Sequence, residues 1–230
     1  MTTTALLLGQ TLSFDADPFP VPVAQAVRIN TDGGVLLRDG QIEQVGDGET
    51  LRAQNPQVPV NDYGDKLILA GFVDAHVHYP QTAMIASWGK RLIDWLNSYT
   101  FPEEMRFGDA DYAAEIAARY LDITTSHGTT TMCSFGTIHP TSVDAFFKEA
   151  LRRGQRVITG KTCMDRNAPD GLRDTPQSAY DDSKALLEKW HGMGRLSYAI
   201  TPRFSPTSTP EQMDAVGALW AEHPDCLMQT

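Results

Sequence analysis

The sequence has few cysteines, little positive charge and no long hydrophobic run. Its three cysteines, Cys133, Cys163 and Cys226, lie far apart among 230 residues, which excludes a disulfide framework or a cysteine-rich zinc cluster. Lys and Arg number 19 against 29 Asp and Glu, and the resulting formal net charge of −10 comes without a basic cluster. This charge disfavours nucleic acid and anionic membranes as partners.

The beginning of the chain lacks the features of a targeting segment. Residues 1–4 carry no basic side chain, and the apolar run over residues 5–8 is too short for a signal-peptide core or a membrane-spanning helix. We therefore expect a cytoplasmic protein. The hydrophobic content of 41% is ordinary for a soluble globular protein with one large or two small domains.

Several motifs for nucleotide and base chemistry are also absent. The sequence contains neither G-x-G-x-x-G nor G-x-x-x-x-G-K, the glycine-rich loops that hold phosphates. It also lacks H-x-E and P-C-x-x-C, which together mark one class of zinc deaminases.

Residues 1–66 are predicted to form a small, all-β N-terminal segment, part of a β-sandwich. Asp39-Gly40 lies between two alternating runs and predicts a two-residue hairpin, because such a turn requires positive φ. The strands expected in this segment are 5–8, 27–30, 34–38 and 41–45.

Residues 67–230 are predicted to form an α/β domain. Helical periodicity follows Asp109, Thr141 and Thr209 and also covers residues 178–191. Strand-like runs alternate with these helices, which argues for a parallel sheet with right-handed crossovers. The strands expected are 67–78, 129–135, 156–164, 196–201 and 226–230. Five strands suit an open sheet, or a (β/α)8 barrel that the sequence leaves incomplete, because a closed barrel needs eight.

His76 and His78 end the first strand of this domain. Side chains two apart on a strand point the same way, so two imidazoles would project side by side and could share a metal ion. A bare His-x-His pair can equally be two histidines with structural roles. Its context, Gly71-Phe72-Val73-Asp74-Ala75-His76-Val77-His78, resembles the metal-binding signature of the amidohydrolase superfamily. The continuation, residues 79–82 and 92–102, resembles the guanine deaminase family within it.

The resemblance implies an amidohydrolase-type (β/α)8 barrel and hydrolysis of a C–N bond of a cyclic amidine. It implies that guanine is converted to xanthine and ammonia, that His76 and His78 bind one zinc ion per subunit, and that the full-length protein is a homodimer. The other metal ligands and a catalytic Glu are expected beyond Thr230, so the 230 residues alone are expected to be inactive. The alternatives are another ring, such as a triazine or a different purine, and a non-catalytic scaffold of the same fold.

The resemblance further implies that four residues bind the substrate: His78, Gln81, Arg203 and Phe204. Arg203 and Phe204 follow the fourth strand and should lie on the same face as the histidines. An Arg fork suits the O6 and N7 acceptors of guanine, and Phe204 can stack on its ring.

Other residues are predicted to support the site. Trp88, Trp95, Tyr99 and Phe101 are expected to form a wall around a flat aromatic ligand. Asp74 could orient a histidine, and His139 is a weaker candidate for that role.

Overall fold

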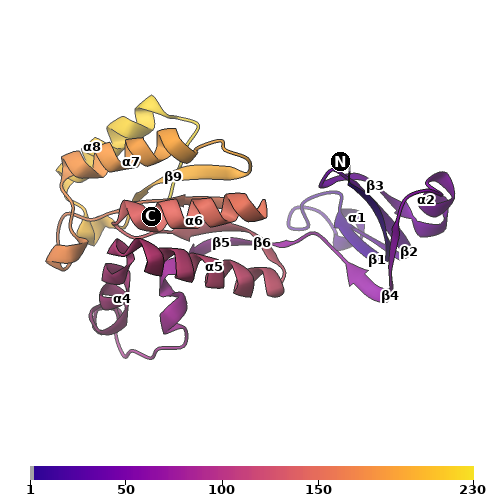
Figure 1. Cartoon of the computed structure of the whole chain (residues 1–230), viewed down its shortest axis with the longest axis horizontal. Helices are drawn as coiled ribbons and strands as arrows, with labels where there is room; N and C mark the ends of the chain where they lie inside the picture. Colours follow the sequence, from indigo (N-terminus) through magenta and orange to yellow (C-terminus); the bar gives the residue numbers. More distant parts are fainter. Residues whose placement is uncertain (1–2) are drawn as a thin grey trace. The chain divides into compact units, whose positions relative to one another are not determined.

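The computed structural model describes residues 3–230, which divide into two compact units with the boundary between Ala70 and Gly71. Each unit has its own sheet, and the two are described separately below (Figure 1). None of the helices in the described part of the chain is long and apolar enough to cross a membrane.

The first unit is a four-stranded sheet in the order β3-β2-β1-β4. The predicted hairpin is confirmed: β2 and β3 are antiparallel, and Asp39 and Gly40 between them have φ of 50° and 75°. Leu6, Leu36 and Leu51 form its small core. The strands are β1 (Thr4–Phe14), β2 (Val27–Arg38), β3 (Gln41–Asp47) and β4 (Val60–Ile68).

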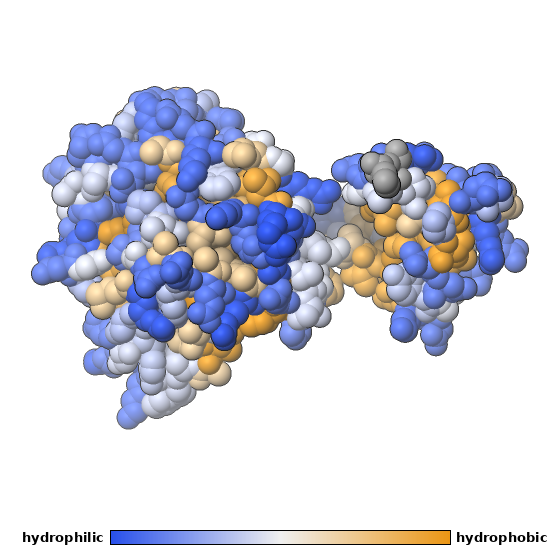
Figure 2. All heavy atoms as spheres, viewed as in Figure 1, coloured by the Kyte–Doolittle hydropathy of each residue, from blue (hydrophilic) through white to orange (hydrophobic). Residues whose placement is uncertain are grey.

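The prediction of an all-β segment was wrong, because this unit also contains the helices α1 (Val23–Ala26) and α2 (Gly48–Gln54). Asp47 caps α2 by accepting a hydrogen bond from the backbone N–H of Thr50. The two strands expected at 27–30 and 34–38 are one strand, β2. Many apolar side chains of this unit are exposed, as the orange areas of Figure 2 show.

The second unit contains the predicted parallel sheet, in the order β10-β9-β7-β6-β5, with β8 paired to β9. Every neighbouring pair in it is parallel. The five predicted strand positions are occupied, and the third is split into two strands. The strands are β5 (Phe72–His78), β6 (Thr129–Phe135), β7 (Arg156–Gly160), β8 (Thr162–Cys163), β9 (Leu196–Pro202) and β10 (Leu227–Met228).

The prediction of one buried strand over residues 67–78 was wrong. One strand ends at Ile68, and the next begins at Phe72. Leu67 and Ile68 belong to β4, where they pair with Gln10 and Thr11 of β1. Leu67 is 49% exposed, so this apolar run is not buried on both faces. An apolar run such as Leu67-Ile68 could belong to the four-stranded sheet or to the parallel sheet. Its pairing with β1 places it in the four-stranded sheet.

Four long helices, α5 to α8, cover the parallel sheet (Figure 1). Phe146 and Phe147 of α6 are fully buried in the core that joins helices and strands. Asp109 caps α5, Gly154 ends α6 with a φ of 69°, and Thr209 caps α8, as predicted. These helices are α5 (Ala110–Ser126), α6 (Pro140–Arg153), α7 (Pro176–Trp190) and α8 (Pro210–Glu222).

The segment between β5 and α5 consists of short helical turns. It passes through a π-helical stretch before Phe101, and a 3-10 turn leads into Asp109. These elements are η1 (Tyr79–Met84), α3 (Leu92–Trp95), η2 (Leu96–Thr100), α4 (Phe101–Met105) and η3 (Arg106–Gly108). Two more 3-10 turns, η4 (Asp170–Leu172) and η5 (Ser205–Thr207), follow β8 and β9. Because the strands are parallel, this segment and the residues after β9 lie at the same carboxyl edge.

Candidate active site

His76 and His78 lie at the carboxyl end of β5, the edge strand of the parallel sheet. Their rings meet edge to face with centroids 5.5 Å apart. The His78 ring also stacks on Phe135 of β6, with centroids 4.5 Å apart and an interplanar angle of 8°. The alternation of β5 therefore brings the two imidazoles together, and Phe135 fixes the plane of one of them.

The His78 imidazole has the properties of a metal or ligand contact. Burial, together with the charges of Arg203 and His76, lowers its pKa to about 3. The ring is therefore neutral at physiological pH, as metal ligation requires. Its Nδ1 atom is buried and has no hydrogen-bond partner among the described residues. An unpaired buried polar atom is costly, so a missing partner is expected there.

A pocket of about 310 Å³ lies beside the two histidines. This volume is at the lower end of the range for small-molecule sites. The structure brings all the predicted site residues to it: His76, His78, Gln81, Arg203 and Phe204. Trp95 and the apolar residues Leu92, Leu96 and Phe135 complete most of the wall.

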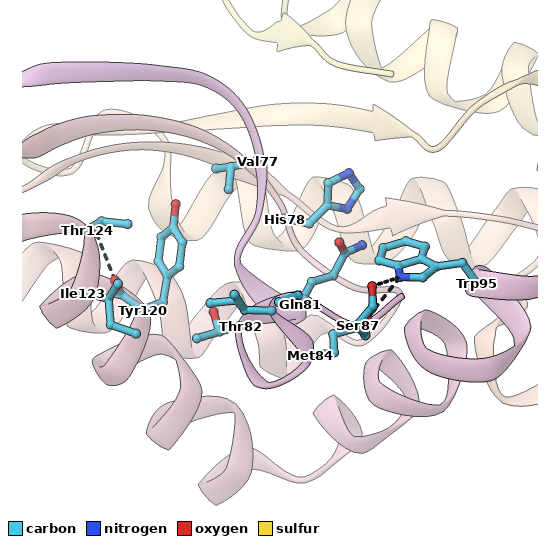
Figure 3. Close-up of a pocket in the computed structure, with 12 residues that line it drawn as sticks. Val77, His78, Gln81, Thr82, Met84, Ser87, Trp95, Tyr120, Ile123 and Thr124 are labelled. Atoms are coloured by element: carbon cyan, nitrogen blue, oxygen red, sulfur yellow. Dashed lines mark hydrogen bonds between the residues drawn. The ribbon is translucent and has the colours of Figure 1, made fainter. Parts of the chain in front are cut away.

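A second hollow, of about 340 Å³, also has His78, Gln81 and Trp95 in its wall (Figure 3). The Trp95 indole N–H donates to the Ser87 hydroxyl at 3.1 Å, which fixes the indole. Gln81 and His78 thus lie between two adjoining cavities.

Arg203 is buried beside the pocket and forms an ion pair with Glu104 of α4. Its Nη1 and Nη2 atoms donate to the two carboxylate oxygens at 2.5 and 3.1 Å. Arg203 is 6% exposed and Glu104 is fully buried. Glu104 therefore occupies two donors of the Arg203 guanidinium. We expected the whole Arg203 fork to be available to a ligand, and this expectation was wrong. Within residues 3–230, the guanidinium has no side-chain acceptor besides this carboxylate.

Burial raises the pKa of Glu104, and the charge and hydrogen bonds of Arg203, followed by a smaller effect of Gln81, oppose that rise. Glu104 was not predicted from the sequence, because it has no motif around it and its partner lies 99 residues away. Nothing in the sequence distinguishes it from the neighbouring Glu103 or from Asp94 in the same segment.

The predicted aromatic wall is mostly wrong. Trp95 lines the pocket, but Trp88 and Tyr99 are exposed. Phe101 is buried and packs in a separate small core, where its ring lies 5.7 Å from the Arg203 guanidinium carbon. The short turns of this segment give no regular face, so four aromatics cannot all point to one side.

The structure does not support the roles suggested for Asp74 and His139. Asp74 accepts a hydrogen bond from the backbone N–H of His76 at 3.2 Å, which does not orient either imidazole. His139 precedes α6 and lies against Gly108, and it does not line the pocket.

A separate group of potential metal ligands, His191, Asp225 and Cys226, occurs among the described residues. His191 Nε2 lies 3.2 Å from the Asp225 carboxylate, whereas Cys226 Sγ lies 3.5 Å from Nδ1 on the opposite side of the ring. Nδ1 already accepts the backbone N–H of Tyr198. Because an imidazole nitrogen needs a free lone pair to bind metal, we interpret this group as structural.

The sequence matches proteins of known function. It is 49% identical to guanine deaminase of Escherichia coli over 92% of this chain and 48% of that protein. It is 43% identical to a probable guanine deaminase of Deinococcus radiodurans, over 91% and 48%. The chain thus spans about half the length of the curated relatives it matches. Residues 33–57 match an imidazolonepropionase-like composite domain of bacteria.

Solved structures agree with these matches. Guanine deaminase from Bradyrhizobium japonicum superposes with a TM-score of 0.94 at 40% identity, over 97% of this chain and 49% of that one. A guanine deaminase from C. acetobutylicum with guanine in its active site gives 0.86 at 28%, over 96% and 51%. The larger unit therefore has the fold of the first part of an amidohydrolase-type (β/α)8 barrel, as predicted. The amidohydrolase family model matches residues 67–230, so this chain belongs to the amidohydrolase family.

Proposed function

We propose that the protein, in its full natural length, is a guanine deaminase that hydrolyses guanine to xanthine and ammonia. One observation carries the proposal: a single pocket joins the His76–His78 pair to Arg203 and Gln81 in a chain 49% identical to a guanine deaminase. A hydrolase of this kind needs a metal and donors that hold the base, and the pocket has residues for both.

His76 and His78 would hold the metal, which we propose is one zinc ion per subunit. Imidazole suits zinc, and the neutral His78 ring with its unpaired Nδ1 fits such a group. Catalytic zinc sites use about three protein ligands, so the remaining ligands would come from the rest of the protein. When bound, zinc lowers the pKa of a water ligand to about 7, which makes hydroxide available at neutral pH.

The chain's own residues would orient the base. The donors of Arg203 that Glu104 does not use can reach a carbonyl or ring nitrogen acceptor, and Phe204 can pack on the ring. Gln81 would contact the polar edge of the base. Adenine would be rejected, because it has an amine where guanine has O6 and would leave a buried Arg donor without an acceptor.

The test measures guanine deamination by the full-length protein, followed as xanthine formation, with bound metal determined by elemental analysis. We expect about one zinc per subunit and turnover that a chelator abolishes and zinc restores. His76→Ala and His78→Ala should each lose zinc and activity together. Rates on adenine and a triazine serve as comparisons. Turnover of one of those rings in place of guanine, or a metal-free protein, would contradict the proposal. Assembly as a homodimer stays a prediction.

A further inference from the structure

Among residues 3–230, Glu104 is a buried acidic side chain that pairs with Arg203, one of the proposed substrate-binding residues. Its carboxylate is fully buried and receives two donors from Arg203. Arg203 lines the pocket, whereas Glu104 does not. A role of Glu104 in the site would therefore act through Arg203.

The same carboxylate gives Arg203 a fixed orientation. A bidentate pair holds the guanidinium plane, and Phe101, 5.7 Å from Cζ, lies beside it. The backbone of Arg203 is fixed as well, because its N–H donates to the Cys163 carbonyl at 3.2 Å. The donors that Glu104 leaves unused therefore lie in a fixed direction.

We infer that Glu104 is a positioning residue that holds the Arg203 guanidinium in one orientation, so that the donors it leaves unused are presented to a ligand in a fixed direction. The pocket then selects a ring that has an acceptor near Arg203. Guanine has such an acceptor in its O6. This inference rests on the proposed function and deepens it by naming the residue that fixes specificity.

The test compares guanine with 2-aminopurine, which has the same amine at C2 but lacks O6. The full-length protein and its Glu104→Gln variant are assayed on both bases. The substituted amide would keep the shape of the side chain but offer one acceptor and a competing donor, so the fixed geometry would loosen. We expect kcat/KM for guanine to fall by about 100-fold, the effect of a small misplacement, and kcat/KM for 2-aminopurine to change by less than about threefold. Zinc content should not change.

The control is Glu103→Gln, on the same helix, where the carboxylate instead pairs with Arg106 and Tyr112. It should leave both rates unchanged. If Glu104→Gln does not fold, Glu104→Asp keeps the charge but is one methylene shorter, and the same selective loss on guanine is expected. An equal loss on both bases, or guanine activity within about threefold of wild type, would overturn the inference. No guanine turnover by the wild-type protein would overturn the proposed function and this inference with it.

Discussion

Two buried ion pairs follow neighbouring strands of the sheet, and they differ in what surrounds them. Lys161 follows β7 and donates to Asp174 at 2.5 Å, with side-chain exposures of 1% and 5%. Arg203 follows β9 and pairs with Glu104 at the same distance, with exposures of 6% and 0%. By burial and distance alone, the two pairs have the same character.

The two ion pairs differ in the residues around them. Asp174 also accepts from Gln212 Nε2 at 2.6 Å and from the Met164 backbone N–H at 3.2 Å, so the protein itself encloses this carboxylate. Neither Lys161 nor Asp174 lines the pocket beside the histidines, whereas Arg203 does. An ion pair that is enclosed by other protein groups can only stabilise the fold. An ion pair with unused donors at a pocket can also bind a ligand.

The largest expected effect is that of Arg203→Ala in the full-length protein. We expect guanine kcat/KM to fall by at least about 1,000-fold, because the loss of a charge-assisted bond to a buried substrate acceptor is costly. Zinc content should change far less than activity. Elemental analysis measures the zinc content, and the kinetic assay measures the activity. A parallel loss of zinc and activity would contradict a role of Arg203 in binding the substrate.

Lys161→Met should act on stability instead. Removing one partner of a buried pair leaves the Asp174 charge without compensation, at a cost of about 3 to 5 kcal/mol in the free energy of unfolding. Denaturant unfolding measures this cost. The ratio of guanine to 2-aminopurine activity should stay at the wild-type value under conditions where the variant is folded, and a changed ratio would mean that this pair also acts on the substrate.

The double variant Lys161→Met with Asp174→Leu sharpens the contrast. Replacing both partners of a buried pair with apolar residues is often neutral or stabilising, although Gln212 then loses its acceptor at about 1 to 3 kcal/mol. We expect the double variant to be more stable than Lys161→Met alone. Greater destabilisation in the double variant would show that the pair has a net stabilising effect of its own.

The smallest effect is expected at an ion pair close to the surface. Hydrogen bonds from Arg152, followed by those from Arg153, lower the pKa of Glu149 to about 2. A lowered folded-state pKa stabilises the fold above the unfolded pKa and loses that effect as pH falls through the folded pKa. Glu149→Gln should cost less than about 1 kcal/mol at pH 7. Unfolding at several pH values should show this difference disappear between about pH 4.5 and 2, and a constant difference would contradict the assignment.

The sequence predicted most of the features that depend on neighbours in the chain. Periodicity and caps located α5 and α8, the dipeptide at residues 39–40 located the hairpin, and His-x-His located two imidazoles that lie together at one pocket. At the start of α8 the Thr209 hydroxyl accepts the backbone N–H of Gln212, while the Gln212 side chain donates to Asp174.

The features that the sequence did not predict depend on distant contacts. The end of a strand at Ile68 depends on the pairing of β4 with β1. β1 lies near the start of the chain, and nothing in its sequence indicates which strand it pairs with. The Arg203–Glu104 pair depends on the placement of α4 by turns that have no regular period. Local patterns identify which residues can do chemistry, and packing decides which of their donors and acceptors remain free.

A crystal structure of the full-length protein with guanine would show whether Arg203 binds the base while Glu104 holds it. We predict the base in the pocket beside His76 and His78, with O6 accepting from Arg203 while Arg203 stays bidentate to Glu104. Guanine bound elsewhere, or an Arg203 that releases Glu104 to reach the base, would contradict this arrangement.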